Sequence, residues 1–181
     1  MRWSQLKKQV ESRTCEPLLG RIQVWTTVYR RTHDAEGRSW ITLDGSEIAS
    51  MATLEAWAEQ HRLAALAVGR DPRAAWDDWG GVRGDRSGYW DEWRAAEDAR
   101  KAAGSFAKFD FTVALWYSLQ LSIEDALRSE DAIIRGMALI DRRLGKRRFV
   151  KLSAEQVAHP LVQRFYRLRA EAEGWPAGQK S

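Results

Sequence analysis

The chain has 181 residues, 44% hydrophobic and 30% charged, which excludes a wholly disordered protein and suits one folded domain with or without an appendage. Its single cysteine excludes an internal disulfide framework and an all-cysteine metal site. The net charge of +4 is small for a dedicated nucleic-acid binder. Because the sequence has no apolar stretch typical of a signal peptide or a membrane span, we expect a cytoplasmic protein.

The first residues predict a helix and three antiparallel strands. Apolar residues at helical spacing favour a helix over 3–13. Over 21–31 the apolar period changes to two, and β-branched and aromatic residues predominate, which predicts a strand. Two further strands are predicted over 39–43 and 46–50, because the Asp44-Gly45 dipeptide between them is typical of a tight hairpin turn.

A second helix is predicted over 54–67, where Thr53 can cap its start and Gly69 its end. Residues 1–69 therefore form the first predicted unit, a helix, a β-meander and a helix. This order resembles the double-stranded-RNA-binding domain, but here the second helix opens without the lysines that contact phosphate in that domain. The difference argues against RNA binding through this unit.

Residues 70–104 are predicted to be an insertion or connector rich in tryptophan and acidic residues. Its first part, 70–87, contains several glycines and is expected to be mobile, whereas 88–103 is expected to be helical. A motif of two tryptophans around two acids occurs twice, 14 residues apart. The tryptophans of the two motifs are Trp76, Trp79, Trp90 and Trp93.

These paired motifs support two interpretations. They can form a flat apolar surface rimmed by carboxylates, suited to a partner that bears basic and aromatic groups. Alternatively, a helix hairpin clamps its own tryptophans into the core, which is the more frequent position of this residue. We favour the core for two of the four tryptophans and leave the other two open.

Residues 105–121 fit both a strand and a helix. Apolar residues occupy every odd position from 109 to 121, as in a strand, and a second set is spaced as one face of a helix. The length of the segment and its helical neighbours favour a helix. The set at helical spacing is Phe106, Phe109, Val113 and Trp116, with Gln120 one turn further.

Four further helices are predicted after residue 121. The signals are a cap at Ser122, a cap at Ser129 with a stop at Gly145, a capping box over Ser153–Gln156, and Pro160 with a stop at Gly174. The two pairs of short and long helices are offset by 28 residues, so either stacked helical repeats or two unrelated amphipathic helices fit.

The predicted fold class is therefore α+β. An N-terminal helix and a three-stranded antiparallel meander are followed by a mostly helical C-terminal part. The helical unit over 105–181 is expected to pack on the first unit, so that the chain forms one compact domain.

Motifs at both ends of the chain carry a family resemblance. They are Met1–Ser4 with Leu6-Lys7, Gly37–Thr42 with Asp44-Gly45 and Glu47-Ile48, Ile140–Arg147, and His159–Val162. Together they resemble a family of small uncharacterised bacterial cytosolic proteins, and the tryptophan-rich middle lies outside the resemblance. The family has no established activity, so the resemblance implies a small, soluble bacterial protein and nothing catalytic.

A run of six cations in ten residues, which we name the basic cluster, is the first candidate site. We expect it at the C-terminus of the long helix before Gly145, where cations complement the helix dipole. It can be a docking patch for phosphate or an acidic partner, or a solvated helix end paired with Glu130, Asp131 or the acidic middle. The cluster is Arg142, Arg143, Lys146, Arg147, Arg148 and Lys151.

The predicted loop between the first two strands is a weak candidate for metal binding or proton transfer. It contains His33, Asp34 and Glu36, whose imidazole and carboxylate groups can serve as metal ligands or as acid and base. Most loops with this composition are simple turns, and we expect no metal and no cofactor.

Three classes of function compete on these observations. The leading hypothesis is a non-catalytic protein–protein interaction module, such as an adaptor, an inhibitor or an immunity-type partner, that binds an unidentified protein. The alternative is nucleic-acid binding through the basic cluster at 142–151. The third is a small hydrolase or metal-dependent enzyme that uses the 33–36 loop.

Overall fold

The computed structural model describes residues 2–28, 37–69, 71, 73 and 87–176. Its strands are β1 (Ile22–Val28), β2 (Gly37–Leu43) and β3 (Ser46–Ala52). Its helices are α1 (Trp3–Ser12), α2 (Thr53–Ala67), α4 (Ser87–Ala102), α5 (Lys108–Ser118), α6 (Ile123–Arg128), α7 (Ala132–Ile140), α8 (Lys146–Phe149) and α9 (Pro160–Glu173), with 3₁₀ turns η1 (Glu16–Leu18) and η2 (Glu155–Val157). The predicted α+β class is confirmed: an N-terminal helix and a three-stranded antiparallel sheet precede a mostly helical C-terminal part.

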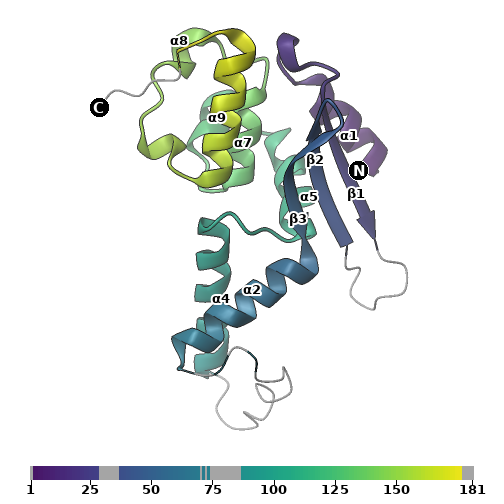
Figure 1. The fold of residues 1–181 in the computed structure, drawn as a ribbon. Helices are drawn as coiled ribbons and strands as arrows, with labels where there is room; N and C mark the ends of the chain where they lie inside the picture. The colour runs from purple at the N-terminus through teal and green to yellow at the C-terminus, as the bar shows by residue number, and fades with distance from the viewer. Residues whose placement is uncertain (1, 29–36, 70, 72, 74–86, 177–181) are drawn as a thin grey trace.

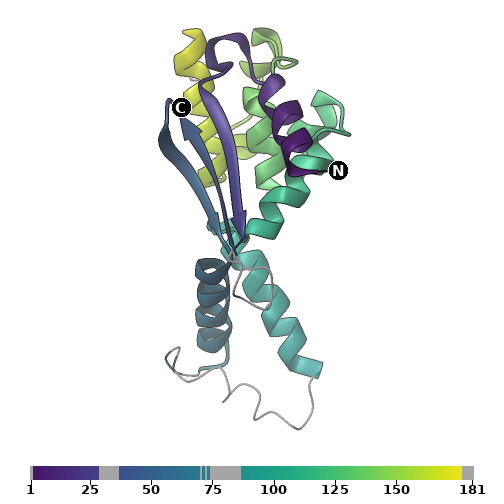
Figure 2. The ribbon, with the colours of Figure 1, turned by 90° about the vertical axis from the view of Figure 1, so that its right-hand side faces the viewer.

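The molecule has two parts, which we name the body and the arm (Figures 1 and 2). The body contains the sheet, α1 and α5 to α9. The arm is the hairpin of α2 and α4, which extends away from one end of the body. The predicted helices over 54–67 and 88–103 are therefore confirmed, and they pack on each other.

The three strands form an antiparallel sheet in the order β1-β2-β3. Asp44 and Gly45 have φ angles of 50° and 81°, the left-handed conformation that the two-residue hairpin turn requires. Along each strand, alternate residues face inward and pack against the helices of the body. The inward residues include Ile22, Val24, Ile41, Ala49 and Met51, all of which are buried.

The outer edge of β1 is occupied by two side chains of α1. The Lys7 ammonium donates to the carbonyl oxygen of Val24 at 2.7 Å, and a Glu11 carboxylate oxygen accepts from the Val24 N–H at 2.9 Å. Lys7 and Glu11 also pair with each other at 2.6 Å. The backbone N–H and carbonyl groups of Val24, at the edge of the sheet, therefore form hydrogen bonds with side chains of α1 instead of with a further strand.

Within the segment over 105–121, residues Lys108–Ser118 form the helix α5, as the length of the segment suggested, and the alternative strand interpretation is wrong. The buried side of α5 consists of Phe111, Ala114 and Leu115, which face the core of the body. The alternation of apolar residues arose because a second apolar face lies on the other side of the same helix.

The last long helix, α9, packs on α7, and the ring of Phe165 lies close against Gly136. A Cβ atom at Gly136 would lie 2.9 Å from the ring of Phe165, so only glycine fits there without a shift. As predicted, α9 begins at Pro160 and ends before Gly174, whose φ of 62° is the left-handed conformation that glycine favours.

Three predicted helix boundaries are wrong. Thr53 does not cap α2: it is itself buried, and the cap position is Ala52. Asp131, and not Ser129, caps α7, because its carboxylate accepts from the N–H groups of Ile133 and Ile134. The stop predicted at Gly145 is also wrong, since α7 ends at Ile140 and Gly145 instead precedes α8.

The capping box over Ser153–Gln156 is present, with both reciprocal hydrogen bonds between Ser153 and Gln156. It opens only the three-residue turn η2 and not a longer helix. The short helix predicted after Ser122 is confirmed as α6, and the Ser122 hydroxyl accepts from the Asp125 N–H at 3.1 Å.

Candidate functional site

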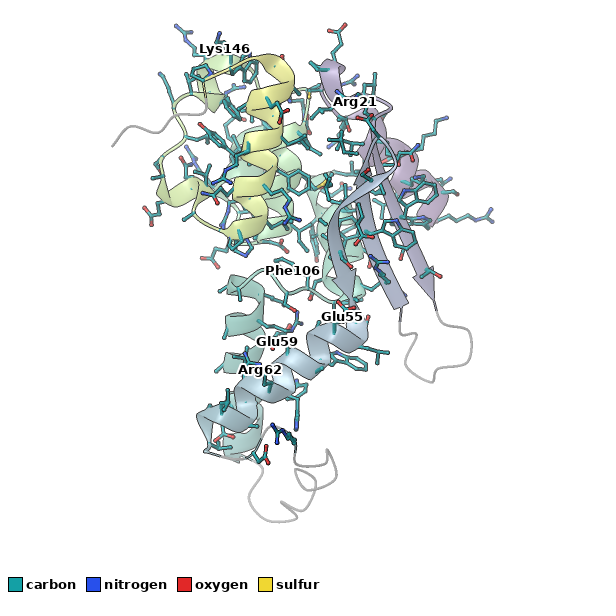
Figure 3. The ribbon with its side chains drawn as sticks, in the orientation of Figure 1. Arg21, Glu55, Glu59, Arg62, Phe106 and Lys146 are labelled. Carbon is teal, nitrogen blue, oxygen red and sulfur yellow. The ribbon has the colours of Figure 1, made fainter. Side chains whose placement is uncertain are left out.

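The basic cluster lies at the end of the body opposite the arm, where Figure 3 labels Lys146. Because α7 ends at Ile140, the placement of the cluster at the C-terminus of that helix is wrong. Arg142 and Arg143 instead lie in the turn that follows α7. The other cations lie in or just after the short helix α8, and they are Lys146, Arg147, Arg148 and Lys151.

Two of the six cations are already paired with carboxylates. Arg143 binds the Asp141 carboxylate at 2.8 Å and the Leu121 carbonyl oxygen at 3.0 Å, and the hydrogen bond to Asp141 raises the pKa of Arg143. Arg148 pairs with Glu124 at 2.7 Å. Asp141 and Glu124 are therefore the acidic partners, instead of the predicted Glu130, Asp131 or acidic middle.

The remaining four cations are exposed, and none has a carboxylate partner within the described part of the chain. They are Arg142, Lys146, Arg147 and Lys151.

A buried arginine fixes the turn that carries these cations. Arg169 of α9 donates to the carbonyl oxygens of Asp141 and Leu144 at 3.2 and 2.9 Å. Its guanidinium also pairs with Glu173 at 3.0 Å and lies over the ring of Trp175. The turn is thus held by α9, although no regular helix runs through it.

The structure describes only part of the two tryptophan motifs. Trp76 and Trp79 lie outside the described residues, and Trp90 lies in α4 but its side chain is outside the described part. Trp93 is half-buried in the arm, and its backbone carbonyl accepts from the Gln60 side chain at 3.0 Å.

The 33–36 loop, with His33, Asp34 and Glu36, also lies outside the described residues. Among the residues that are described, no group of three or more His, Cys, Asp or Glu could hold a metal ion.

The imidazole of His159 and the thiol of Cys15, two groups that often act in catalysis, have structural roles here. Nδ1 of His159 accepts from the Leu161 N–H, so Nε2 carries the proton and donates to the Lys101 carbonyl oxygen at 2.8 Å. Cys15 is buried, and burial raises the pKa of its thiol. A buried thiol of raised pKa is a poor nucleophile.

The outer face of the sheet carries a pair of tryptophans. Trp25 and Trp40 lie opposite each other on β1 and β2, and their rings stack with centroids 6.2 Å apart. Lys7 lies over the ring of Trp25 and Arg38 over that of Trp40. These rings are therefore engaged with each other and with cations, as expected for a cross-strand pair that stabilises the sheet.

The arm joins the body at a polar junction around Arg100, whose side chain is only 3% exposed. Its guanidinium donates to the Gln60 side chain, the Ser105 carbonyl oxygen and the Asp110 carboxylate, each at 2.9–3.0 Å. Nearby, Lys101 pairs with Glu97 at 2.6 Å and Asp110 at 3.4 Å. Arg100 thus connects both arm helices to the start of α5.

A groove of about 650 Å³ lies beside this junction, and we name it the α4/α5/α7 groove. Figure 3 shows Phe106 where the arm meets the body, and the groove extends from this residue along α5. Its apolar lining is Ala102, Phe106, Phe109, Val113 and Ala132. Its polar lining is Glu97, Asp98, Lys101, Asp110, Glu130, Asp131, Arg135 and His159.

The apolar wall of this groove continues along the solvent side of α5, which we name the aromatic face. Phe109 is 71% exposed, Trp116 41% and Tyr117 51%, and Val113 between them is half-buried. Trp116 and Tyr117 contact edge to face with ring centroids 4.8 Å apart. The aromatic face is therefore an exposed row of aromatic side chains, and the opposite side of the same helix is packed in the core.

Sequence reasoning found the helical spacing of this face but not its exposure. Phe109, Val113 and Trp116 belong to the stripe that predicted the helix. When both faces of a helix are apolar, the sequence does not show which face is buried, because the residues of each face recur at the same helical spacing.

No described helix is long and apolar enough to cross a membrane. Neither the curated proteins nor the solved structures contain a match to this chain. A family model described as the SF0329 protein family matches residues 2–170, well over half of the sequence. The chain therefore belongs to the SF0329 protein family, an uncharacterised family, which confirms that part of the resemblance.

Proposed function

We propose that this protein is a non-catalytic protein–protein interaction module that binds its partner through the aromatic face of α5. The observation that carries the proposal is the exposure of Phe109, Trp116 and Tyr117 on one side of a helix whose opposite side is fully packed. Exposed apolar patches of this kind are typical of protein interaction sites. An adaptor, inhibitor or immunity-type role in the bacterial cytoplasm is consistent with such a surface.

The energetics favour binding over a purely structural role for these side chains. Burial of each large apolar side chain contributes roughly 1.5–3 kcal/mol, and aromatic residues are frequent hot spots of interfaces. The fold already has Phe111 and Leu115 on the buried side of α5, so the exposed rings are not needed for the core. Because α5 packs on the sheet and on α7, the helix that carries these rings is fixed in position before any partner binds.

The test is affinity capture followed by reconstitution with purified components. The full chain, and a variant with Trp116→Ser and Tyr117→Ser, are used to capture proteins from an extract, and each captured protein is then purified and titrated. We expect the double variant to bind at least tenfold more weakly. A matched control with Leu54→Ser and Leu66→Ser removes comparable exposed apolar surface from α2 and should bind normally. Equal binding by all three proteins would contradict the proposal.

A second candidate function is nucleic-acid binding through the basic cluster. It is supported by the exposed cations at one end of the body, four of which lack a described carboxylate partner. If this function holds, the affinity for a labelled RNA or DNA oligonucleotide should fall steeply as salt rises. Replacing Arg147 and Lys151 by alanine should reduce that salt dependence, whereas removing Trp116 and Tyr117 should not. The hydrolase hypothesis on the 33–36 loop stays a prediction.

A further inference from the structure

We infer that the α4/α5/α7 groove receives a basic segment of a partner protein. An apolar side chain of that segment enters the groove, and lysine or arginine side chains on either side of it bind carboxylates on the rim. This inference rests on the proposed function, because it specifies the chemistry of the partner at the same surface.

The floor of the groove suits an apolar anchor. Phe106 is buried, whereas Phe109 and Val113 remain accessible, so an entering apolar side chain can contact the Phe109 ring and the Val113 methyl groups. The small side chains of Ala102 and Ala132 also line the groove. The volume of about 650 Å³ is within the range of sites that bury a ligand of several side chains.

The rim of the groove has the opposite charge to the chain as a whole. Five carboxylates line the groove against two cations, although the protein carries a net charge of +4. Both cations are occupied: Lys101 pairs with Glu97 and Asp110, and Arg135 donates to the Ser129 carbonyl oxygen at 2.7 Å.

Two carboxylates of the rim remain available to a ligand. Asp98 and Glu130 are exposed, and neither has a cationic partner among the described residues. Asp98 lies on α4 and Glu130 just before α7, so they belong to different walls of the groove. Cations spaced around an apolar anchor can therefore reach both walls. Rim charges of this kind contribute mainly to specificity and association rate.

The length of the apolar surface favours a segment of protein over a small amine. From Phe109 to Tyr117 the aromatic face spans nine residues of helix, and the eight steps between them cover about 12 Å at 1.5 Å per residue. A small cation in the groove would leave Trp116 and Tyr117 exposed. A second copy of the chain is also disfavoured, because a symmetric contact would place the same acidic rim near itself.

The experiment uses random 15-residue peptides displayed on phage and selected against the full chain. We expect the selected peptides to carry an apolar or aromatic residue flanked by lysine or arginine. Synthetic copies should bind at least tenfold more weakly to a variant with Asp98→Asn and Glu130→Gln, and their affinity should fall as salt rises. The matched control, Glu55→Gln with Glu155→Gln, removes two exposed carboxylates elsewhere and should keep full affinity.

The other outcomes separate the two proposals. Neutral or acidic peptides that depend on Trp116 and Tyr117, but not on Asp98 and Glu130, would overturn this inference and leave the proposed function standing. Peptides insensitive to both variants, or no selected peptides at all, would overturn both. A wild-type dimer in sedimentation that dissociates on changing Trp116 and Tyr117 would assign the groove to a second copy and overturn the inference.

Discussion

The body is a sheet packed against helices and the arm is a pair of helices, and the two parts are stabilised in different ways. The body encloses a continuous core of large side chains, with Phe111, Phe149 and Phe165 among those fully buried. Among the described residues of the arm, a separate apolar cluster has Ala64, Ala65 and Ala96 as its buried members. Alanine contributes little apolar area, so the burial of these three residues stabilises the packing of α2 on α4 only weakly.

The difference shows that polar contacts determine how the arm is attached. Arg100 joins Gln60 of one arm helix to Asp110 at the start of α5. His159, from the cap of α9, adds a hydrogen bond to the last turn of α4. Polar networks specify geometry well, but they are costly when a partner is removed. The arm should therefore open without unfolding the body.

The largest effect is expected from Phe165→Ala in the core of the body. The variant removes a fully buried ring that packs against Gly136, and it should lower the free energy of unfolding by about 3–5 kcal/mol. Urea denaturation followed by circular dichroism measures the change. Val150→Ala, at an exposed apolar position, is the control and should change stability by less than about 0.5 kcal/mol. Equal effects in both variants would contradict the core assignment.

A smaller and local effect is expected from Arg100→Met at the junction. The change removes the guanidinium donor to the Gln60 side chain and one of the donors to the Asp110 carboxylate, which keeps Lys101, and it should cost about 2 kcal/mol. Hydrogen exchange should show faster exchange in α2 and α4, while α7 and α9 stay protected. The buried thiol of Cys15 reports on the body, and its labelling by a disulfide reagent should stay as slow as in the wild type. Uniform loss of protection would show that arm and body open together.

His159→Ala should have an effect of about 1 kcal/mol, the usual size for loss of a helix cap. It removes the acceptor for the Leu161 N–H and the donor to the Lys101 carbonyl oxygen. Hydrogen exchange should therefore become faster both at the start of α9 and at the end of α4. Such a result would show that the His159 ring links the arm to the body. Gln163→Ala, exposed on the first turns of α9, is the matched control. A change confined to α9 would exclude His159 as a link to the arm.

The smallest effect is a pH dependence at Lys101. Burial lowers the pKa of Lys101, but the hydrogen bond to Glu97 and the charge of Asp110 outweigh burial, so the pKa is raised. The stabilising contribution is thus complete below the unfolded-state pKa of about 10.4 and is lost as pH rises through the higher folded-state pKa. Unfolding by urea at pH 8 to 11 should show this loss in the wild type. The difference between wild type and Lys101→Met should shrink over the same range.

The fold was largely predictable because its local signals agree with its packing. The Asp44-Gly45 dipeptide, the alternation of β1 and the Pro160 and Gly174 boundaries of α9 all correspond to the structure. The start of α7 was less predictable, because Ser129 and Asp131 are both good caps and only the carboxylate reaches two N–H groups. The end of α7 was not predictable from nearby residues. Arg169, which binds the carbonyl oxygen of Asp141 just after this helix, is 28 residues further along the chain.

The candidate site was less predictable than the fold. A run of cations in the sequence does not show which of them are paired, and the partners of Arg143 and Arg148 come from other segments. Likewise, the spacing of Phe109, Val113 and Trp116 predicts a helix but not the side that faces solvent. The α4/α5/α7 groove combines residues from the arm, α5 and α7, so it exists only once these elements pack.

The contact of α1 with the outer edge of β1 also limits how this protein can associate with others. Lys7 and Glu11 occupy both backbone groups of Val24, much as a neighbouring strand would. On the opposite edge, Arg164 donates to the Ile48 carbonyl oxygen of β3. A foreign strand would have to displace these side chains before it could extend the sheet, which protects the chain against polymerising edge to edge. Natural variants that lack Lys7 or Glu11 should therefore aggregate before their helical structure changes.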